Sequence, residues 1–222
     1  MAEVMPLNFP LPSESAVASY SYTDVAEGTG VTVFNLVGAT GDNILTTQTV
    51  YADKIEEESA VTDTTSAYVK IFDVDYDLSA FNMPKTIEGT GLLNFSQYGK
   101  GSGDETSWWY FTIVVKKYDG STETTIGTVN SSTLSATGVH TTTNLELLPI
   151  TLSQTHFAIG DILRVTVEGY IKDTGWISGG RNTLKIGIGQ DPMNRDGSYL
   201  IPSTNTGEIT LNKIYIPFKL DL

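Results

Sequence analysis

The chain has 222 residues and a formal net charge of −13, and hydrophobic residues make up 40% of it, which is enough for a substantial core. This length fits one large all-β domain or two small ones. Cysteine is absent, which excludes disulfides and thiolate metal sites.

The acidic charge is concentrated in the first half of the chain. Residues 1–111 contain sixteen Asp and Glu but four Lys and Arg, and no basic residue occurs before Lys54. Such charge either keeps a protein soluble, its usual effect, or faces a basic partner. It repels phosphates, and no apolar run is long enough to span a membrane. We therefore expect no nucleic acid partner and no membrane partner.

The N-terminal segment differs in composition from the rest. Residues 1–20 contain PLNFPLPSES, a Pro-rich stretch that predicts an extended arm. The segment lacks the basic start and apolar run of a signal peptide. Phe9 and Leu11 are its candidates for contact with a neighbouring molecule. We expect an arm at 1–20 and a single domain at 21–222.

Most of the remaining chain alternates between apolar and polar residues, which is the period of a β-strand. Strands are predicted at residues 31–37, 43–52, 67–79, 85–99, 107–118, 122–129, 162–172, 183–190 and 211–220. A short helix is predicted around Ala52–Ala60. The alternation changes phase between Ile71 and Phe72, which indicates a bulge. Pro217 cannot donate to a ladder, so it predicts an edge strand or a bulge.

The strongest local signal is a hairpin. Residues 107–118 place Trp109 and Phe111 on the inner face, and Asp119-Gly120 then separates this strand from the next. About eight to ten strands with turn signals between them are typical of sandwiches and barrels. The sequence predicts an all-β fold, an antiparallel β-sandwich in the form of a jelly roll.

Three carboxylates share one face of a predicted strand. Asp73, Asp75 and Asp77 alternate with apolar residues, and with a loop they could hold Ca²⁺. Alternate residues on a strand lie about 6.6 Å apart, which is too far for easy convergence on one ion. We prefer a solvated face that discourages edge-to-edge aggregation. No cofactor is expected, and Ca²⁺ is the alternative.

No catalytic motif occurs in the sequence. The two histidines are not paired, and there is neither a nucleophile elbow nor a phosphate-binding loop. Glu146, Asp161 and Glu168 are available for glycoside hydrolysis, but no spacing marks them. We therefore predict that the chain is not an enzyme.

Two aromatic residues lie opposite the predicted core face. Trp108 and Tyr110 could stack on sugars or anchor a protein interface. A second layer or the N-terminal arm could equally cover them. The first alternative favours a carbohydrate-binding or receptor-binding protein.

Two segments carry a family resemblance. They are LELLPITLSQTHFAIGDILRVTVEGYIKD (145–173) and GIGQDPMNRDG (187–197). Together they resemble jelly-roll virion structural proteins of tailed bacteriophages, in which a His-Asp-Pro-x-Asn-Arg run is frequent. Residues 191–195 match that run, and Gln190 replaces its histidine.

The resemblance implies a non-enzymatic structural role in a virion. A decoration, cement or minor capsid protein on the outer capsid surface is the expectation. Its partners would be the major capsid protein or another virion protein, and further copies of itself, for example in a trimer. Asp191, Asn194 and Arg195 are our candidates for contact residues in this loop. We expect the 187–197 stretch to connect strands and to touch another subunit.

Overall fold

The computed structural model describes residues 29–39, 42–48, 55–61, 67–100, 106–137, 141–173, 184–190 and 212–219. All regular secondary structure in these ranges is β. The strands are β1 (Thr29–Ala39), β2 (Asp42–Thr46), β3 (Ile55–Val61), β4 (Val69–Asp77), β5 (Lys85–Lys100), β6 (Thr106–Tyr118), β7 (Glu123–Asn130), β8 (Leu134–Thr137), β9 (Thr141–Phe157), β10 (Ile162–Asp173), β11 (Leu184–Gln190) and β12 (Lys213–Lys219). The prediction of an all-β, mostly antiparallel fold is confirmed.

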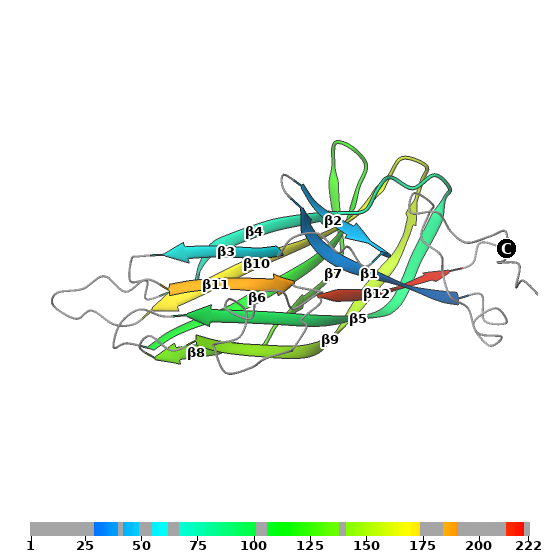
Figure 1. Ribbon diagram of the computed structural model, residues 1–222. Coiled ribbons are helices and arrows are strands. Elements are labelled where there is room, and N and C mark those ends of the chain that lie inside the picture. The colour runs from blue at the N-terminus through cyan, green and yellow to red at the C-terminus, as the bar shows by residue number, and fades with distance from the viewer. Residues whose placement is uncertain are drawn as a thin grey trace, which may run out of the picture.

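The strands form one hydrogen-bonded network that is folded into two layers (Figure 1). The front layer contains β9, β5, β11, β3, β12, β1 and β2. The back layer contains β4, β10, β6, β7 and β8. The layers are joined on one side by a parallel bridge between Ile44 of β2 and Asp77 of β4. On the other side the Ser153 hydroxyl of β9 donates to the Ile126 carbonyl of β7 over 3.1 Å.

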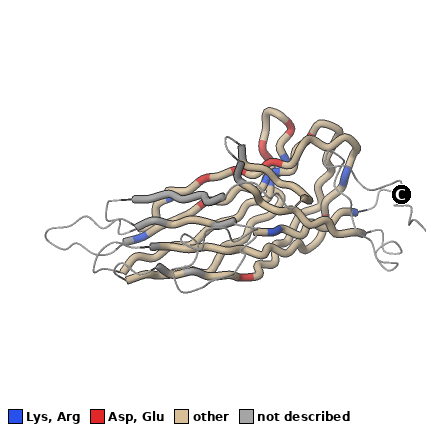
Figure 2. The backbone as a smooth tube through the Cα atoms, in the orientation of Figure 1, with Lys and Arg blue, Asp and Glu red and all other residues tan. Residues whose placement is uncertain are grey.

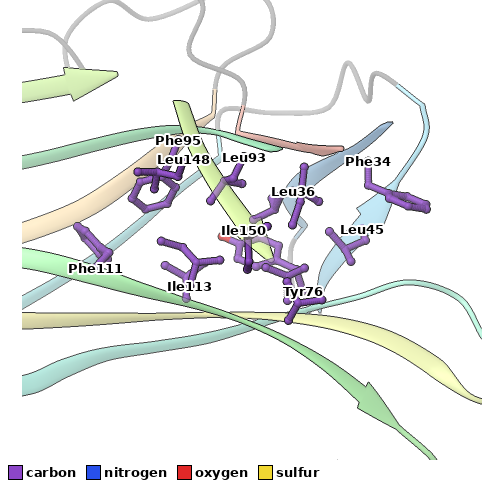
Figure 3. Packing of buried hydrophobic residues seen from close by; sticks show 14 of the residues in the cluster. Phe34, Leu36, Leu45, Tyr76, Leu93, Phe95, Phe111, Ile113, Leu148 and Ile150 are labelled. Atoms are coloured by element: carbon purple, nitrogen blue, oxygen red, sulfur yellow. The ribbon is translucent and has the colours of Figure 1, made fainter. Parts of the chain in front are cut away.

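The core lies between the two layers. The inward residues of β6 have no exposed surface, and they are Trp109, Phe111, Ile113 and Val115. The Phe111 ring of the back layer lies 5.5 Å from the Phe95 ring of the front layer. Figure 3 shows both rings within the same buried cluster. The odd-numbered alternation in the sequence of residues 107–118 therefore identified the buried face of this strand correctly.

A close approach of backbones joins the two layers at β7 and β9. A Cβ atom added to Gly127 would lie 2.6 Å from Leu152 Cδ2 and 2.8 Å from the Thr151 carbonyl oxygen. Because real Cβ atoms do not come this close to backbone, glycine is required at this position.

The sequence indicated irregular strand pairing at two places, near Ile71 and at Pro217. In β4 the bulge falls at Ile71, because Gly169 of β10 lies opposite Phe72 and Tyr170 lies opposite Lys70. The ladder between β12 and β5 is irregular beside Pro217, between Tyr215 and Phe218, but the extra residues lie on β5, and β12 pairs with β1 without a break.

The edge-strand alternative for Pro217 is wrong, because β12 lies between β1 and β5. The helix predicted around Ala52–Ala60 is also wrong: residues 55–61 form β3 and pair with β11. In such a short segment, pairing with a neighbouring strand decides the conformation over a weak local preference.

The hairpin after β6 forms as predicted. Gly120 has a φ of 93°, which glycine adopts without strain. The Asp119 carboxylate accepts hydrogen bonds from the amides of Ser121 and Thr122. The arm predicted at residues 1–20 lies outside the described residues. Within the described ranges, no helix is long and apolar enough to cross a membrane.

Candidate functional site

The outer face of the back layer carries the acidic residues singled out in the sequence. Asp73, Asp75 and Asp77 project from β4 on this face, opposite Glu168, Thr166 and Arg164 of β10. Register partners in antiparallel strands point to the same side of a sheet. The shared face predicted for the three carboxylates is therefore present.

Basic side chains already bind all three carboxylates. Arg164 donates to both oxygens of Asp77, over 2.6 Å from Nε and 2.7 Å from Nη2. Its Nη1 also lies 3.3 Å from Asp75. Lys70 Nζ lies 2.7 Å from Asp73. Among the described residues no cluster of acidic or histidine side chains is arranged to hold a metal ion.

Arg164 is the centre of this network. It pairs with Glu123 of β7 as well, and its guanidinium lies 4.4 Å from the centroid of the Tyr118 ring. The hydrogen bonds to Asp77 raise the pKa of Arg164 above its ordinary value, partial burial opposes this, and Glu123 adds to it. Lys116, followed by Arg164, lowers the pKa of Glu123. The guanidinium of Arg164 on β10 thus contacts carboxylates of both β4 and β7.

An aromatic cluster occupies the other end of the same face. The Tyr110 ring stacks on Tyr170 with centroids 5.0 Å apart and planes at 8°. The Tyr68 ring meets Tyr110 edge-on, also at 5.0 Å. Trp108 is half-buried next to this cluster, in register with Lys172. The structure therefore brings Trp108 and Tyr110 to the outer face, as predicted.

The tyrosine rings pack mainly against one another. The Tyr170 hydroxyl donates to Glu168 over 2.7 Å. That hydrogen bond, together with burial, raises the pKa of Tyr170 to about 12. Because Tyr110 has Tyr170 on its face and Tyr68 at its side, little of its ring remains for a ligand. Trp108 has no stacking partner among the described rings.

The outer face of the front layer is different in kind. One row of residues crosses four strands in register: Val33 of β1, Tyr215 of β12, Leu92 of β5 and Pro149 of β9. Neighbouring positions on the same face add further apolar side chains. We call this surface the apolar face, and its members are Val31, Val33, Leu92, Leu145, Leu147, Pro149, Tyr215 and Pro217.

The apolar face is open to solvent. Leu147 is 63% exposed and Leu145 56%, while Val31, Leu92 and Val33 are 36–43% exposed. Five of the nine large hydrophobic side chains that are exposed among the described residues lie on this one face. Such a contiguous patch marks an interaction surface, whereas single exposed apolar residues are ordinary.

Among the described side chains of β1, β5, β9 and β12, few outward ones are charged. On β12 the outward charges are Lys213 and Lys219, and Lys219 lies 3.4 Å from Glu88 of β5. Figure 2 shows few red or blue segments along β5, β9 and β12. This surface could not be predicted from the sequence, because alternation along one strand cannot show that outward residues of four strands lie side by side. A signal was present in LELLPITL (145–152), where apolar residues occupy both faces of one strand.

The remaining carboxylate candidates lie in separate places. Glu146 accepts hydrogen bonds from Ser132 and Gln97 at the edge between the layers. Asp161 closes the turn after β9, where Lys117 lowers its pKa by hydrogen bonding. Glu168 binds Lys70 over 3.1 Å. Each carboxylate therefore has a structural partner. The contact candidates Phe9, Leu11, Asp191, Asn194 and Arg195 lie outside the described residues.

Comparisons with known proteins give similarity in fold. No protein-family model matches the chain, and no curated protein matches its sequence. An α-amino acid ester hydrolase is similar with a TM-score of 0.50 and 11% identity, over 84% of this chain and 36% of that one. An aminopeptidase from a marine sediment Thaumarchaeota archaeon is similar with a TM-score of 0.49 and 9% identity, over 85% of this chain and 37% of the aminopeptidase chain. A chain of the infectious bursal disease virus particle is similar with a TM-score of 0.32 and 13% identity, over 99% of this chain and 44% of the viral chain.

These comparisons correct one prediction. The chain spans little more than a third of the hydrolases that it matches. The prediction that the chain is not an enzyme is contradicted, because its fold is one that hydrolase chains contain. The error came from treating a β-sandwich without a catalytic motif as evidence against an enzyme. At 11% identity the likeness shows the fold alone, and it transfers no activity.

Proposed function

We propose that the chain is a structural assembly module, which the apolar face holds against another protein within a larger particle. The observation that carries this proposal is the uncovered row from Val33 to Pro149, which crosses four strands. Fully burying a Leu or Val side chain is worth about 1.5–3 kcal/mol. A surface with several such side chains has a strong tendency to be covered.

A virion is the assembly that the sequence favours. The segments 145–173 and 187–197 resemble structural proteins of tailed bacteriophages, and the first of them contributes Leu145, Leu147 and Pro149 to the apolar face. In this proposal the chain lies on the outer capsid surface, with a capsid protein or another virion protein beneath it.

Carbohydrate binding is the alternative that the outer face of the back layer offers. Its support is weaker, because the Tyr110 ring is stacked on Tyr170 and bordered by Tyr68. Among the described side chains of this face, Trp108 is the candidate to stack on a sugar. Glycan-array binding that is lost in Trp108→Ala would favour this alternative over the assembly module.

Mass spectrometry of purified particles tests the proposed function. The chain is expected among the abundant proteins of particles from the source that encodes it. Its incorporation should fall strongly in Leu147→Glu, because burying an unpaired carboxylate is costly. The matched control is Ile159→Glu, since Ile159 is 68% exposed and lies in the turn after β9, away from the apolar face. Particles that lack the chain, or that incorporate both variants equally, would contradict the proposal.

A further inference from the structure

We propose that residues 132–137 form a flap that closes one edge of the core, and that the carboxylate of Glu146 is the latch that holds this flap shut. The flap contains the strand β8 (Leu134–Thr137) and the residues just before it. It lies at the edge of the back layer, beside β9 of the front layer (Figure 1). This inference goes beyond the proposed function and does not depend on the apolar face.

The two sides of the sandwich are closed in different ways. On one side, Ile44 of β2 and Asp77 of β4 form a backbone bridge between the layers. On the other side, the ladder of β9 runs to β5, and the ladders of β7 and β8 run to β6. Among the described residues, no backbone-to-backbone hydrogen bond links β9 to β7 or β8. Side chains therefore hold the layers together on the β9 side.

Glu146 of β9 makes the central polar link on this side. Its register partner is Phe95, a core residue, so the Glu146 side chain points inward from the edge strand. Its carboxylate accepts hydrogen bonds from the amide and the hydroxyl of Ser132, over 3.1 and 2.8 Å. Gln97 of β5 donates to the same carboxylate over 2.8 Å. Loss of this carboxylate would therefore leave Ser132 and Gln97 without their shared acceptor.

The attachments of the flap place its hinge at Ser131. The amide and the hydroxyl of Ser131 exchange hydrogen bonds with the backbone of Phe111, both over 2.8 Å. Beyond this hinge, β8 has four residues and pairs with β6. On the β7 side of the hinge the layers are packed too closely to part, because a Cβ on Gly127 would lie 2.8 Å from the Thr151 carbonyl oxygen. Opening should therefore begin at β8, since short edge segments open with the least free energy.

Trp109 of β6 lies next to the flap. Its register partner on β8 is Leu134, and its ring lies against Gly99 of β5, where an added Cβ would come within 2.6 Å. The Trp109 side chain has no exposed surface, yet its Nε1 donates to no group among the described residues. A buried donor without an acceptor is destabilising, and water can reach this one when the flap opens. The closed flap therefore needs its latch.

Thiol labelling tests whether the flap opens by itself, since the chain has no native cysteine. Ala136→Cys places a thiol on the flap, at a side chain that is 4% exposed. The matched control is Val165→Cys on β10, where the side chain has no exposed surface. Position 136 should be labelled at least about tenfold faster, because local opening requires less free energy than unfolding of the sandwich. In the unsubstituted chain, the amides of β8 should likewise exchange hydrogen faster than those of β10.

Substitution of Glu146 tests the latch. Added to Ala136→Cys, Glu146→Ala should speed labelling at least about tenfold, because several hydrogen bonds to a charged group no longer favour the closed flap. Glu146→Gln keeps one carbonyl acceptor and should give a smaller increase. The matched control is Glu88→Ala, since the contact between Glu88 and Lys219 does not involve the flap. This control should leave the labelling rate at position 136 unchanged, and circular dichroism checks that each variant is folded.

Several results would overturn the inference. Equal labelling at positions 136 and 165 would mean that β8 is released only when the whole sandwich unfolds. A labelling rate at position 136 that Glu146→Ala leaves unchanged would mean that Glu146 does not hold the flap. An equal increase in Glu88→Ala would mean that overall stability, and not the latch, controls the rate. If Ala136→Cys does not fold, hydrogen exchange of β8 and β10 in the unsubstituted chain and in Glu146→Ala decides by the same criteria.

Discussion

The two outer faces of the sandwich have the same β geometry but differ in whether their outward side chains have partners within the molecule. On the back layer, each outward carboxylate of β4 has a basic partner, and the tyrosine rings pack against one another. On the front layer, outward Leu and Val side chains meet solvent. The back face is complete within one molecule, whereas the front face becomes complete when another surface covers it. Outward residues should therefore stabilise the fold on the back layer and association on the front layer.

Removing the central cation should have the largest effect on folding. Arg164→Met leaves Asp77, Asp75 and Glu123 without their common partner, and the Arg164 side chain is only 15% exposed. We expect the free energy of unfolding in urea to fall by about 3 kcal/mol. A change below about 0.5 kcal/mol would contradict the view that this face stabilises the fold.

Truncating the stacked tyrosine should have the next largest effect. Tyr110→Ala removes contacts with both Tyr170 and Tyr68, and we expect a loss of about 2 kcal/mol in urea unfolding. The matched front-layer variant is Leu147→Ala, which also loses a large outward apolar side chain. In dilute protein, the Leu147→Ala substitution should lower the free energy of unfolding by less than about 0.5 kcal/mol. Equal losses in the two variants would remove the distinction between the faces.

Acid should destabilise the fold by protonating carboxylates that basic side chains stabilise. Lys116 and Arg164 lower the pKa of Glu123, and Lys117 lowers that of Asp161. A carboxyl group whose pKa is lower in the folded state stabilises the fold above its unfolded pKa, and this contribution is lost as the pH falls through the folded pKa. The melting temperature should therefore fall as the pH drops below about 4.5.

The arginine variant provides the control for this pH dependence. In Arg164→Met the pKa of Glu123 should lie closer to its ordinary value, so the fall in melting temperature should be shallower. An identical pH profile in Arg164→Met and the unsubstituted chain would show that the network does not control acid stability.

The smallest effect is expected at the edge of the apolar face. Val33→Thr keeps the β-branched shape of an outward side chain that is 36% exposed. Unfolding of dilute protein should change by less than about 0.5 kcal/mol. A loss above about 1 kcal/mol would mean that Val33 stabilises the single sandwich.

Strict alternation along the sequence predicted the strands and their buried faces. The predictions were wrong or missing for short segments whose conformation depends on pairing with a neighbouring strand. The inward residues of β6 and β10 follow directly from their two-residue period, and the phase change at Ile71 marked a bulge. The short strand β3 was mistaken for a helix, because seven residues carry too little local preference to override tertiary pairing. The strand β8, of four residues, gave no signal of its own.

The functional surfaces were predictable only in part. Trp108 and Tyr110 stood out because they alternate with core residues along one strand. The stacking of Tyr110 on Tyr170 depends on the register between β6 and β10, which the sequence does not show. The apolar face depends on the register of four strands, and β1 and β12 lie at opposite ends of the described chain. No pattern within a single segment contains that information.

Thiol labelling in the assembled state tests the central claim most directly. Leu147→Cys and Ile159→Cys each give a chain with one cysteine, at positions that are 63% and 68% exposed in the single molecule. If the apolar face is the assembly surface, a maleimide should label both equally in dilute protein. In the assembled state, labelling should slow at least about tenfold at position 147 alone, because the thiol is then buried. Equal labelling of the two positions in the assembled state would contradict the account.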